Sequence, residues 1–272
     1  MMARLIHIRL DRAVQNPHRR IMKNSKPFDI NQVRKDIDRV DTALLSLIAE
    51  RLELANYVKQ AKRGGAIWRP SREESHVRNL AQATQHSSPG LVSRIWAELM
   101  SASLSIQGPL TVHVGLDRDK NNQALSLVRD RFGASLPLEF HASEMAALAA
   151  AYGDENAVAI VPAPRNGMRW WTALTANGAM PELKIMARLP RYDASDWPEA
   201  VAVAVGDLAP SGDDMTLLAV DDTRALPPQA IIRAESGSHI LASIDGFVAA
   251  DALEGELSII GVLPTPLSQQ ME

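Results

Sequence analysis

The stretch from Ile30 to Arg63, INQVRKDIDRVDTALLSLIAERLELANYVKQAKR, decides the fold of the N-terminal part of the chain. It contains neither proline nor glycine, its apolar residues recur every three or four positions, and Asp29 or Asn31 can cap its start. This pattern predicts one long helix. At the helical rise it would extend roughly 50 Å, longer than a small domain is wide, so half of its apolar stripe has nothing in its own chain to contact. A partner chain is therefore expected.

Two shorter predicted helices follow the long one, and then the sequence pattern changes to alternating strands and helices. Residues 71–84 predict a second helix, with Ser71 and Glu74 forming a capping box, and residues 91–106 predict a third. Beyond residue 108, short apolar segments alternate with Ala- and Leu-rich helices, the βαβ pattern of an α/β domain. The predicted elements of this second part are 110–115, 122–132, 143–152, 157–161, 183–187, 200–205, 215–220, 231–234, 240–244 and 257–262.

Composition excludes several classes of function. The 272 residues suit two domains, and 29 Lys and Arg against 32 Asp and Glu give a net charge of -3, so no basic field indicates nucleic acid or a membrane surface. The chain has no cysteine and therefore no disulfide, thiol nucleophile or thiolate metal site. No apolar run is long enough to span a bilayer. We expect a cytoplasmic protein whose residues 1–27 are disordered or a mis-assigned start.

Cations share the buried seam of the long helix. Steps of three and four along it give Arg34, Ile37, Asp41, Leu44, Ile48, Arg51, Ala55, Val58 and Lys62. Burying an ionised group on the core face of a helix costs several kcal/mol of folding free energy unless a group of opposite charge meets it. One aspartate cannot balance Arg34, Arg51 and Lys62, so these three cations indicate a bound anion. Arg34 and Arg51 would lie about 25 Å apart along the helix and cannot hold one small molecule from a single chain. In an antiparallel dimer, Arg34 of one chain could approach Arg51 and Lys62 of the other.

Polar residues of the other helices extend this pattern. Ser103 and Gln107 lie on one seam of the third helix, and Arg72 and Glu73 begin the second. The set is rich in hydrogen-bond donors, poor in nucleophiles and free of metal ligands. Each cation alone is more often a side chain that snorkels to solvent, so periodicity by itself predicts only a helical dimer that binds a small polyanion.

Three segments resemble a known family. VRKDIDRVDTALLSLIAERLELANYVKQAK (33–62), WRPSREE (68–74) and LMSASLSIQ (99–107) are similar to the all-helical chorismate mutases, especially those fused to prephenate dehydratase in bacterial phenylalanine biosynthesis. The resemblance implies an α+β chain: an all-α three-helix mutase domain over 28–108 that forms an intertwined homodimer, followed by an α/β, periplasmic-binding-protein-like domain over 109–272. It also implies isomerisation of chorismate to prephenate without cofactor or metal.

The resemblance assigns substrate-binding residues by position. Arg34 matches an arginine that reaches into the partner's site, Arg51 one that grips a substrate carboxylate, and Arg72 a further active-site arginine. Ser103 matches a contact to a carboxylate.

It also assigns catalytic residues, among them Arg51. Lys62 and Gln107 match the two donors to the ether oxygen that breaks away, and Glu73 matches the carboxylate that binds the ring hydroxyl. Arg69 is a departure, because some members carry an acidic residue there.

The second part of the chain resembles a degenerate prephenate dehydratase. PLTVHVGLDRD (109–119), ENAVAIVPAP (155–164) and DDMTLLAV (213–220) occupy the places of its motif-bearing strands, but the catalytic motifs themselves are missing. Residues 230–272 are shorter than a full regulatory domain and are interpreted as a remnant of one. We therefore expect that an aromatic amino acid could act as an effector. His113 and His141 show no ligand spacing and receive no role.

Three functions follow from these expectations. The leading one is a chorismate mutase of phenylalanine and tyrosine biosynthesis. The nearest alternative is a bifunctional mutase and dehydratase. An alternative of another class is a non-catalytic sensor of an aromatic acid. For all three functions we expect neither a nucleic acid nor a membrane as a partner.

Overall fold

A computed structural model describes residues 29–61, 66–84, 86–117, 121–192, 195–249 and 257–267. The chain divides into two compact units, Met1–Leu47 and Ile48–Glu272. The start of the chain, expected to be disordered or mis-assigned, lies outside the described residues. Among the helices of the described residues, none is both long and apolar enough to cross a membrane.

The long helix α1 (Ile30–Ala61) agrees with its prediction, and it runs from the first unit into the second. Its start is capped by Asp29, whose Oδ1 accepts a hydrogen bond from the backbone N of Asn31 at 3.0 Å. Ala55 alone among the α1 residues is buried. Large apolar side chains of the first unit, such as Leu44 and Leu45, are 51% and 69% exposed. In the first unit, the apolar side chains of the predicted stripe are therefore exposed.

Proline begins the next two helices, α2 (Pro70–Ala83) and α3 (Pro89–Gln107). Ser88 caps α3 by accepting a hydrogen bond from the backbone N of Leu91. The predicted capping box of α2 is wrong. Arg69 occupies the cap position without a side-chain hydrogen bond, because Pro70 takes the first helical position and needs no acceptor for its nitrogen.

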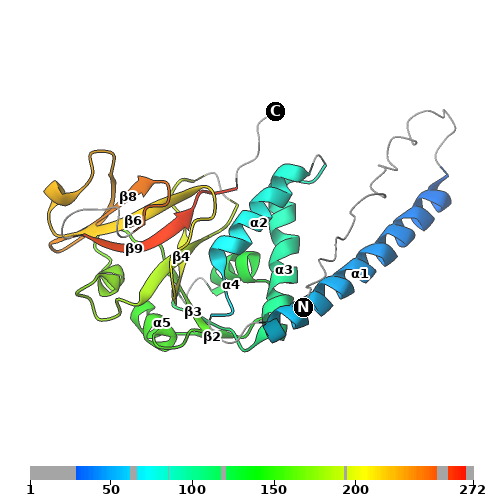
Figure 1. Ribbon diagram of the computed structural model, residues 1–272, viewed down its shortest axis with the longest axis horizontal. Coiled ribbons are helices and arrows are strands. Elements are labelled where there is room, and N and C mark those ends of the chain that lie inside the picture. The colour runs from blue at the N-terminus through cyan, green and yellow to red at the C-terminus, as the bar shows by residue number, and fades with distance from the viewer. Residues whose placement is uncertain are drawn as a thin grey trace, which may run out of the picture. The chain divides into compact units, whose positions relative to one another are not determined.

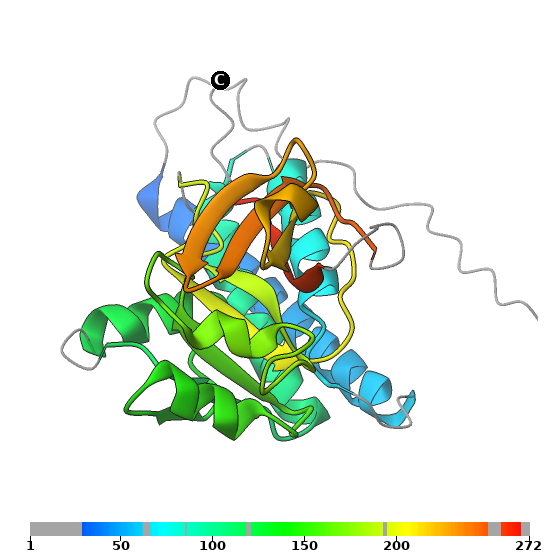
Figure 2. The ribbon, with the colours of Figure 1, turned by 90° about the vertical axis from the view of Figure 1, so that its left-hand side faces the viewer.

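The rest of the second unit is built on one mixed sheet of nine strands in the order β2-β1-β3-β5-β4-β9-β6-β8-β7. Figures 1 and 2 both show the orange and red strands β6 to β9 at one end of the sheet and the green strands at the other. The strands are β1 (Thr111–Val114), β2 (Leu138–Phe140), β3 (Ala157–Pro162), β4 (Leu183–Leu189), β5 (Ala200–Val205), β6 (Asp214–Val220), β7 (Ile231–Ser236), β8 (His239–Asp245) and β9 (Ser258–Pro264).

A narrow joint connects the two halves of this sheet. Between β4 and β9 only Ile185 and Gly261 pair. A Cβ on Gly261 would lie 2.5 Å from the Cβ of Ile185, so this approach requires glycine. The described strands thus form one continuous sheet, and the periplasmic-binding-protein-like detail of the expected fold is not confirmed.

Helices cover both faces of the first half of the sheet. Val112 and Val114 pack with α4 (Asn121–Phe132) on one face. Ala157 and Ala159 pack on the other face, where α5 (Glu144–Ala151) and the 3-10 helix η3 (Trp170–Leu174) contribute to the core. A second 3-10 turn, η4 (Thr223–Ala225), follows β6. Strands covered on both faces read as continuous apolar runs, as AVAIV in β3 does.

Candidate active site

A cavity of about 730 Å³ lies among the C-terminal half of α1, α2 and α3. Three guanidinium groups and one carboxylate line it, so its charge favours an anion. The lining residues are Arg51, Leu54, Ala55, Val58, Ile67, Arg69, Arg72, Glu73, Ser75, His76, Asn79, Met100, Ser103, Leu104 and Gln107. Five of the residues assigned by sequence are among them: Arg51, Arg72, Glu73, Ser103 and Gln107.

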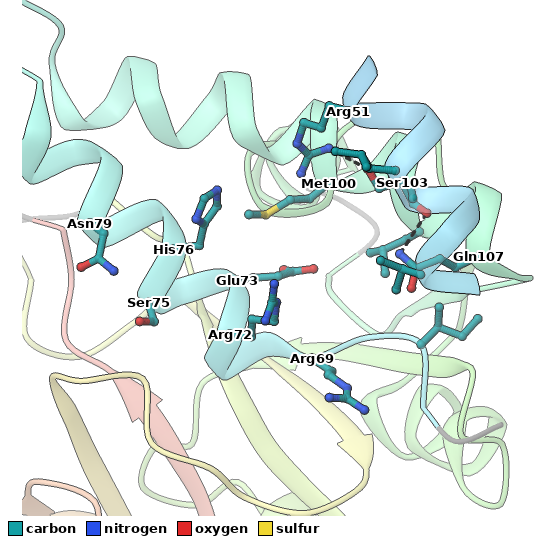
Figure 3. A pocket seen from close by; sticks show the side chains of 15 residues that line it. Arg51, Arg69, Arg72, Glu73, Ser75, His76, Asn79, Met100, Ser103 and Gln107 are labelled. Atoms are coloured by element: carbon teal, nitrogen blue, oxygen red, sulfur yellow. Dashed lines mark hydrogen bonds between the residues drawn. The ribbon is translucent and has the colours of Figure 1, made fainter. Parts of the chain in front are cut away.

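Arg51 is held by the end of α3. Its Nη1 donates to the Oγ of Ser103 at 2.6 Å and to the backbone oxygen of Leu99 at 2.8 Å, and Ser103 Oγ itself donates to the Leu99 oxygen at 2.7 Å. Figure 3 shows this contact as a dashed line beside Met100. Burial lowers the pKa of Arg51, and the nearby Glu73 carboxylate opposes that shift. The guanidinium is thus fixed at the cavity wall with further N–H groups for a ligand.

Gln107 closes the C-terminal end of α3 at the same cavity. Its Nε2 donates to the backbone oxygen of Ser103 at 3.2 Å, which holds the amide against the last turn of the helix. An amide nitrogen carries two N–H groups, so the second can serve a ligand. The i, i+4 spacing of Ser103 and Gln107 places both on one helix face.

Glu73 is the most perturbed titratable group of the cavity. Its Oε2 lies 3.1 Å from Nη1 of Arg131 and 3.3 Å from Nε1 of Trp68. Burial raises the pKa of Glu73 to about 7, although Arg191 and the Trp68 N–H lower it; Glu74 raises it and Arg51 lowers it by smaller amounts. Burial disfavours the charged carboxylate more than its donors restore it. Glu73 therefore titrates near neutral pH.

Sequence reasoning missed His76 and Asn79, which also line the cavity. Figure 3 shows His76 on α2 together with Arg72 and Glu73. Burial and then the charges of Arg51 and Arg72 lower the pKa of His76. The spacing of residues 72, 76 and 79 is helical, so the face of α2 that carries Arg72 could have predicted both positions.

Two of the assigned residues are not placed in this cavity. Lys62 lies outside the described residues. Arg34 is an exposed residue of α1 in the first unit, whereas every lining residue belongs to the second. Their roles stay predictions from the resemblance.

A buried hydroxyl of the sheet has hydrogen-bond partners of another kind. The hydroxyl of Thr216 in β6 donates to the backbone oxygen of Gly246 at 2.7 Å and accepts from the backbone N of Val248 at 2.9 Å. Thr216 is fully buried. This hydroxyl joins two backbone segments, and Thr216 is not among the residues that line the cavity of the helical part.

Comparison with known proteins concerns the helical part alone. The family described as chorismate mutase type II matches residues 33–108. The bifunctional chorismate mutase/prephenate dehydratase of Neisseria gonorrhoeae is 34% identical over 80 residues, which cover 29% of this chain and 22% of that protein. No solved structure matches the chain. The residues matched by this family model contain the cavity and its polar side chains, so the likeness to chorismate mutase type II is confined to the helical part that forms the cavity.

Proposed function

We propose that this protein is a chorismate mutase, which isomerises chorismate to prephenate in the biosynthesis of phenylalanine and tyrosine. One observation carries the proposal: five residues that the resemblance assigns to the reaction line a single cavity with three cations and one carboxylate. Chorismate is a dicarboxylate, so a cavity of this charge is complementary to it.

The cavity supplies orientation. The enolpyruvyl side chain of chorismate folds over the ring before its ether C–O bond breaks and a C–C bond forms, with no proton transfer. Arg51, already fixed by Ser103 and Leu99, would grip one carboxylate through charge-assisted hydrogen bonds. Holding the folded conformer converts rotational freedom into a gain in rate.

Donors to the ether oxygen supply the second contribution. Negative charge grows on this oxygen as the C–O bond breaks, and Gln107 with Lys62 would donate to it. Because this interaction strengthens in the transition state, it raises kcat and not only affinity. Glu73 in its ionised form would accept the hydrogen bond of the ring hydroxyl and fix the position of the ring.

The active form would be a homodimer through α1. The exposed apolar side chains of this helix support such an interface, and Arg34 would reach the partner's cavity from it. A cavity completed by a second chain explains why α1 continues well beyond the residues that line it.

The assay of chorismate loss by absorbance tests the proposal with the full chain. One aliquot of the product is then acidified and another is treated with base before phenylpyruvate is read. Chorismate loss with phenylpyruvate only after acid supports a mutase without dehydratase. Phenylpyruvate without acid supports the bifunctional alternative, and absence of chorismate loss contradicts the proposal and leaves the aromatic-acid sensor.

A further inference from the structure

Helix α4 places a buried arginine behind a carboxylate that lines the cavity. Arg131 belongs to α4, is 2% exposed, and places Nη1 3.1 Å from Oε2 of Glu73. Within the described residues, the Nε and Nη2 atoms of Arg131 meet no acceptor. Glu73 is therefore the one described hydrogen-bond partner of this guanidinium.

Local packing fixes where Arg131 can lie. Its guanidinium carbon lies 5.6 Å from the ring centroid of Phe132, and that ring packs on Trp68 with centroids 5.4 Å apart. Trp68 in turn donates to the same Glu73 oxygen. Two donors thus converge on one oxygen and leave the other carboxylate oxygen for the cavity.

A neighbouring pair provides a contrast. Glu74, the next residue of α2, is 1% exposed and accepts from Nε of Arg191 at 2.9 Å, but it does not line the cavity. Removing one partner of a buried ion pair leaves an uncompensated charge at a cost of several kcal/mol. Glu74 meets Arg191 away from the cavity, and Nη2 of Arg191 also lies 3.9 Å from Oε2 of Glu73, whereas the hydrogen bond from Arg131 goes to the carboxylate that lines the cavity.

We infer that Arg131 is a positioning residue that orients the Glu73 carboxylate for the substrate, so that helix α4 supports the mutase site. The inference rests on the proposed function. Hydrogen bonds to the charged form of a carboxylate favour that form, so Arg131 also favours ionised Glu73. The other charged groups around Glu73 are Arg191 after β4, Arg51 on α1 and Glu74 on α2.

Arg131→Met tests the inference in the full chain. We expect kcat/KM to fall on the order of 10-fold or more, by analogy with the loss of a residue that hydrogen-bonds to a metal-binding side chain. The midpoint of the pH profile of kcat/KM should move to higher pH, because Glu73 loses a donor that favours its ionised form. Arg131→Lys should restore part of the rate, because it keeps a charged donor. In a chain that carries Glu73→Gln, Arg131→Met should have no further effect on kcat/KM, because Arg131 acts through Glu73.

Arg78→Met is the matched control. Arg78 is a half-buried arginine of α2 that donates to the backbone oxygen of Thr265 and does not line the cavity. The Arg78→Met substitution should lower the free energy of unfolding and leave the pH profile of kcat/KM unchanged. An unchanged profile in Arg131→Met, or equal losses of rate with and without Glu73→Gln, overturns the inference. Absence of chorismate turnover in the unmodified chain overturns the proposed function instead.

A second, independent cluster lies on the sheet edge and changes the view of two histidines. In the parallel pair β1 and β2, His113 is in register with Glu139, and His141 follows Glu139 by two residues on the same face. The backbone N of His141 donates to Val114 O at 2.8 Å, which continues the ladder to residue 141. The absence of ligand spacing noted in the sequence therefore reflects an unpredicted strand, β2.

Distances within this cluster suit a metal ion. His113 Nδ1 lies 3.0 Å from His141 Nε2 and 3.4 Å from a Glu139 oxygen. Ligand atoms of a tetrahedral zinc ion with bonds near 2.0 Å are about 3.3 Å apart. His113 is buried while the Glu139 side chain is 62% exposed, so one side stays open for a water ligand.

The geometry points to a divalent transition-metal site formed by His113, Glu139 and His141, with two imidazoles and one carboxylate as in zinc sites. Titration of chelator-treated full chain with Zn²⁺ by calorimetry, and with Co²⁺ by visible absorption, tests it. We expect 1:1 binding that weakens on the order of 10-fold or more in His113→Ala and in His141→Ala, and a tetrahedral Co²⁺ spectrum.

His239→Ala is the control for this site, because His239 pairs with Asp221 elsewhere on the sheet. It should bind both ions like the unmodified chain. Absence of binding, or isotherms unchanged by His113→Ala and His141→Ala, shows that the two rings merely share a hydrogen bond and overturns the site.

Discussion

Two buried hydroxyls, one in the cavity and one in the sheet, show how the two regions differ. Ser103 accepts from Arg51 at 2.6 Å and lines the cavity, whereas Thr216 of β6 bonds only to the backbone of residues 246 and 248. In the first region polar groups hold other polar groups toward a ligand. In the second they hold the fold. Substitutions should therefore reduce turnover in one region and stability in the other.

The largest effect is expected for Arg51→Ala. The cavity would lose the guanidinium that Ser103 and Leu99 fix, and we expect kcat/KM for chorismate to fall on the order of 10³-fold, because truncation of a buried charged partner costs several kcal/mol. Steady-state kinetics measure it. Arg129→Ala, which removes an exposed arginine of α4, should leave kcat/KM unchanged. A comparable loss in both variants would contradict a specific role of Arg51.

Lys62→Ala should have the next largest effect. A lost donor to the ether oxygen should depress kcat on the order of 10²-fold, by analogy with a lost oxyanion donor. KM should change less than kcat, because the donor acts mainly in the transition state. Unchanged kcat would remove Lys62 from the reaction.

The pH dependence gives a smaller and sharper test. Because burial raises the pKa of Glu73 to about 7, its ionised fraction rises between pH 6 and pH 8, and kcat/KM should rise on the order of 10-fold over that interval. Glu73→Gln should remove this step. The pKa of His76 is lowered by burial and by Arg51 and Arg72, so its own titration would fall below the step. Activity that decreases with pH would mean that the protonated carboxyl is the competent form.

The smallest effect on turnover is expected for Thr216→Val. The carbonyl of Gly246 and the N–H of Val248 would lose their partner, so the free energy of unfolding should fall by about 1–3 kcal/mol while kcat/KM stays unchanged. Denaturant unfolding and the absorbance assay measure the two quantities. Thr172→Val, at a hydroxyl that bonds to a single backbone oxygen in η3, should cost less. Loss of turnover in Thr216→Val, with the protein still folded, would show that β6 influences the reaction.

Sequence patterns predicted the long, periodic elements and failed at short or paired ones. The apolar periodicity of α1 and the continuous run in β3 are visible in the chain alone. Strand β2 has only three residues, none of them buried, so no pattern indicated it. Its absence from the prediction also hid the register that brings His113 to Glu139.

The cavity was predictable to a similar degree. Arg51 and Ser103 stand out because polar groups interrupt apolar seams, and the resemblance gave them roles. The contact of Arg131 with Glu73 joins residues 58 positions apart and depends on how α4 packs against α2, which no local pattern encodes. His76 follows Arg72 at helical spacing, so the same pattern contains the information that places it at the cavity.

The adjacency of Glu73 and Glu74 on α2 constrains how this chain can change over evolutionary time. The two carboxylates accept hydrogen bonds from arginines of separate segments of the second half, Arg131 on α4 and Arg191 after β4. A lineage that discards the sheet must first neutralise Glu74, whose side chain would otherwise lose its buried partner, and must find another support for Glu73. Selection on the helical part can therefore also retain the second half of the chain.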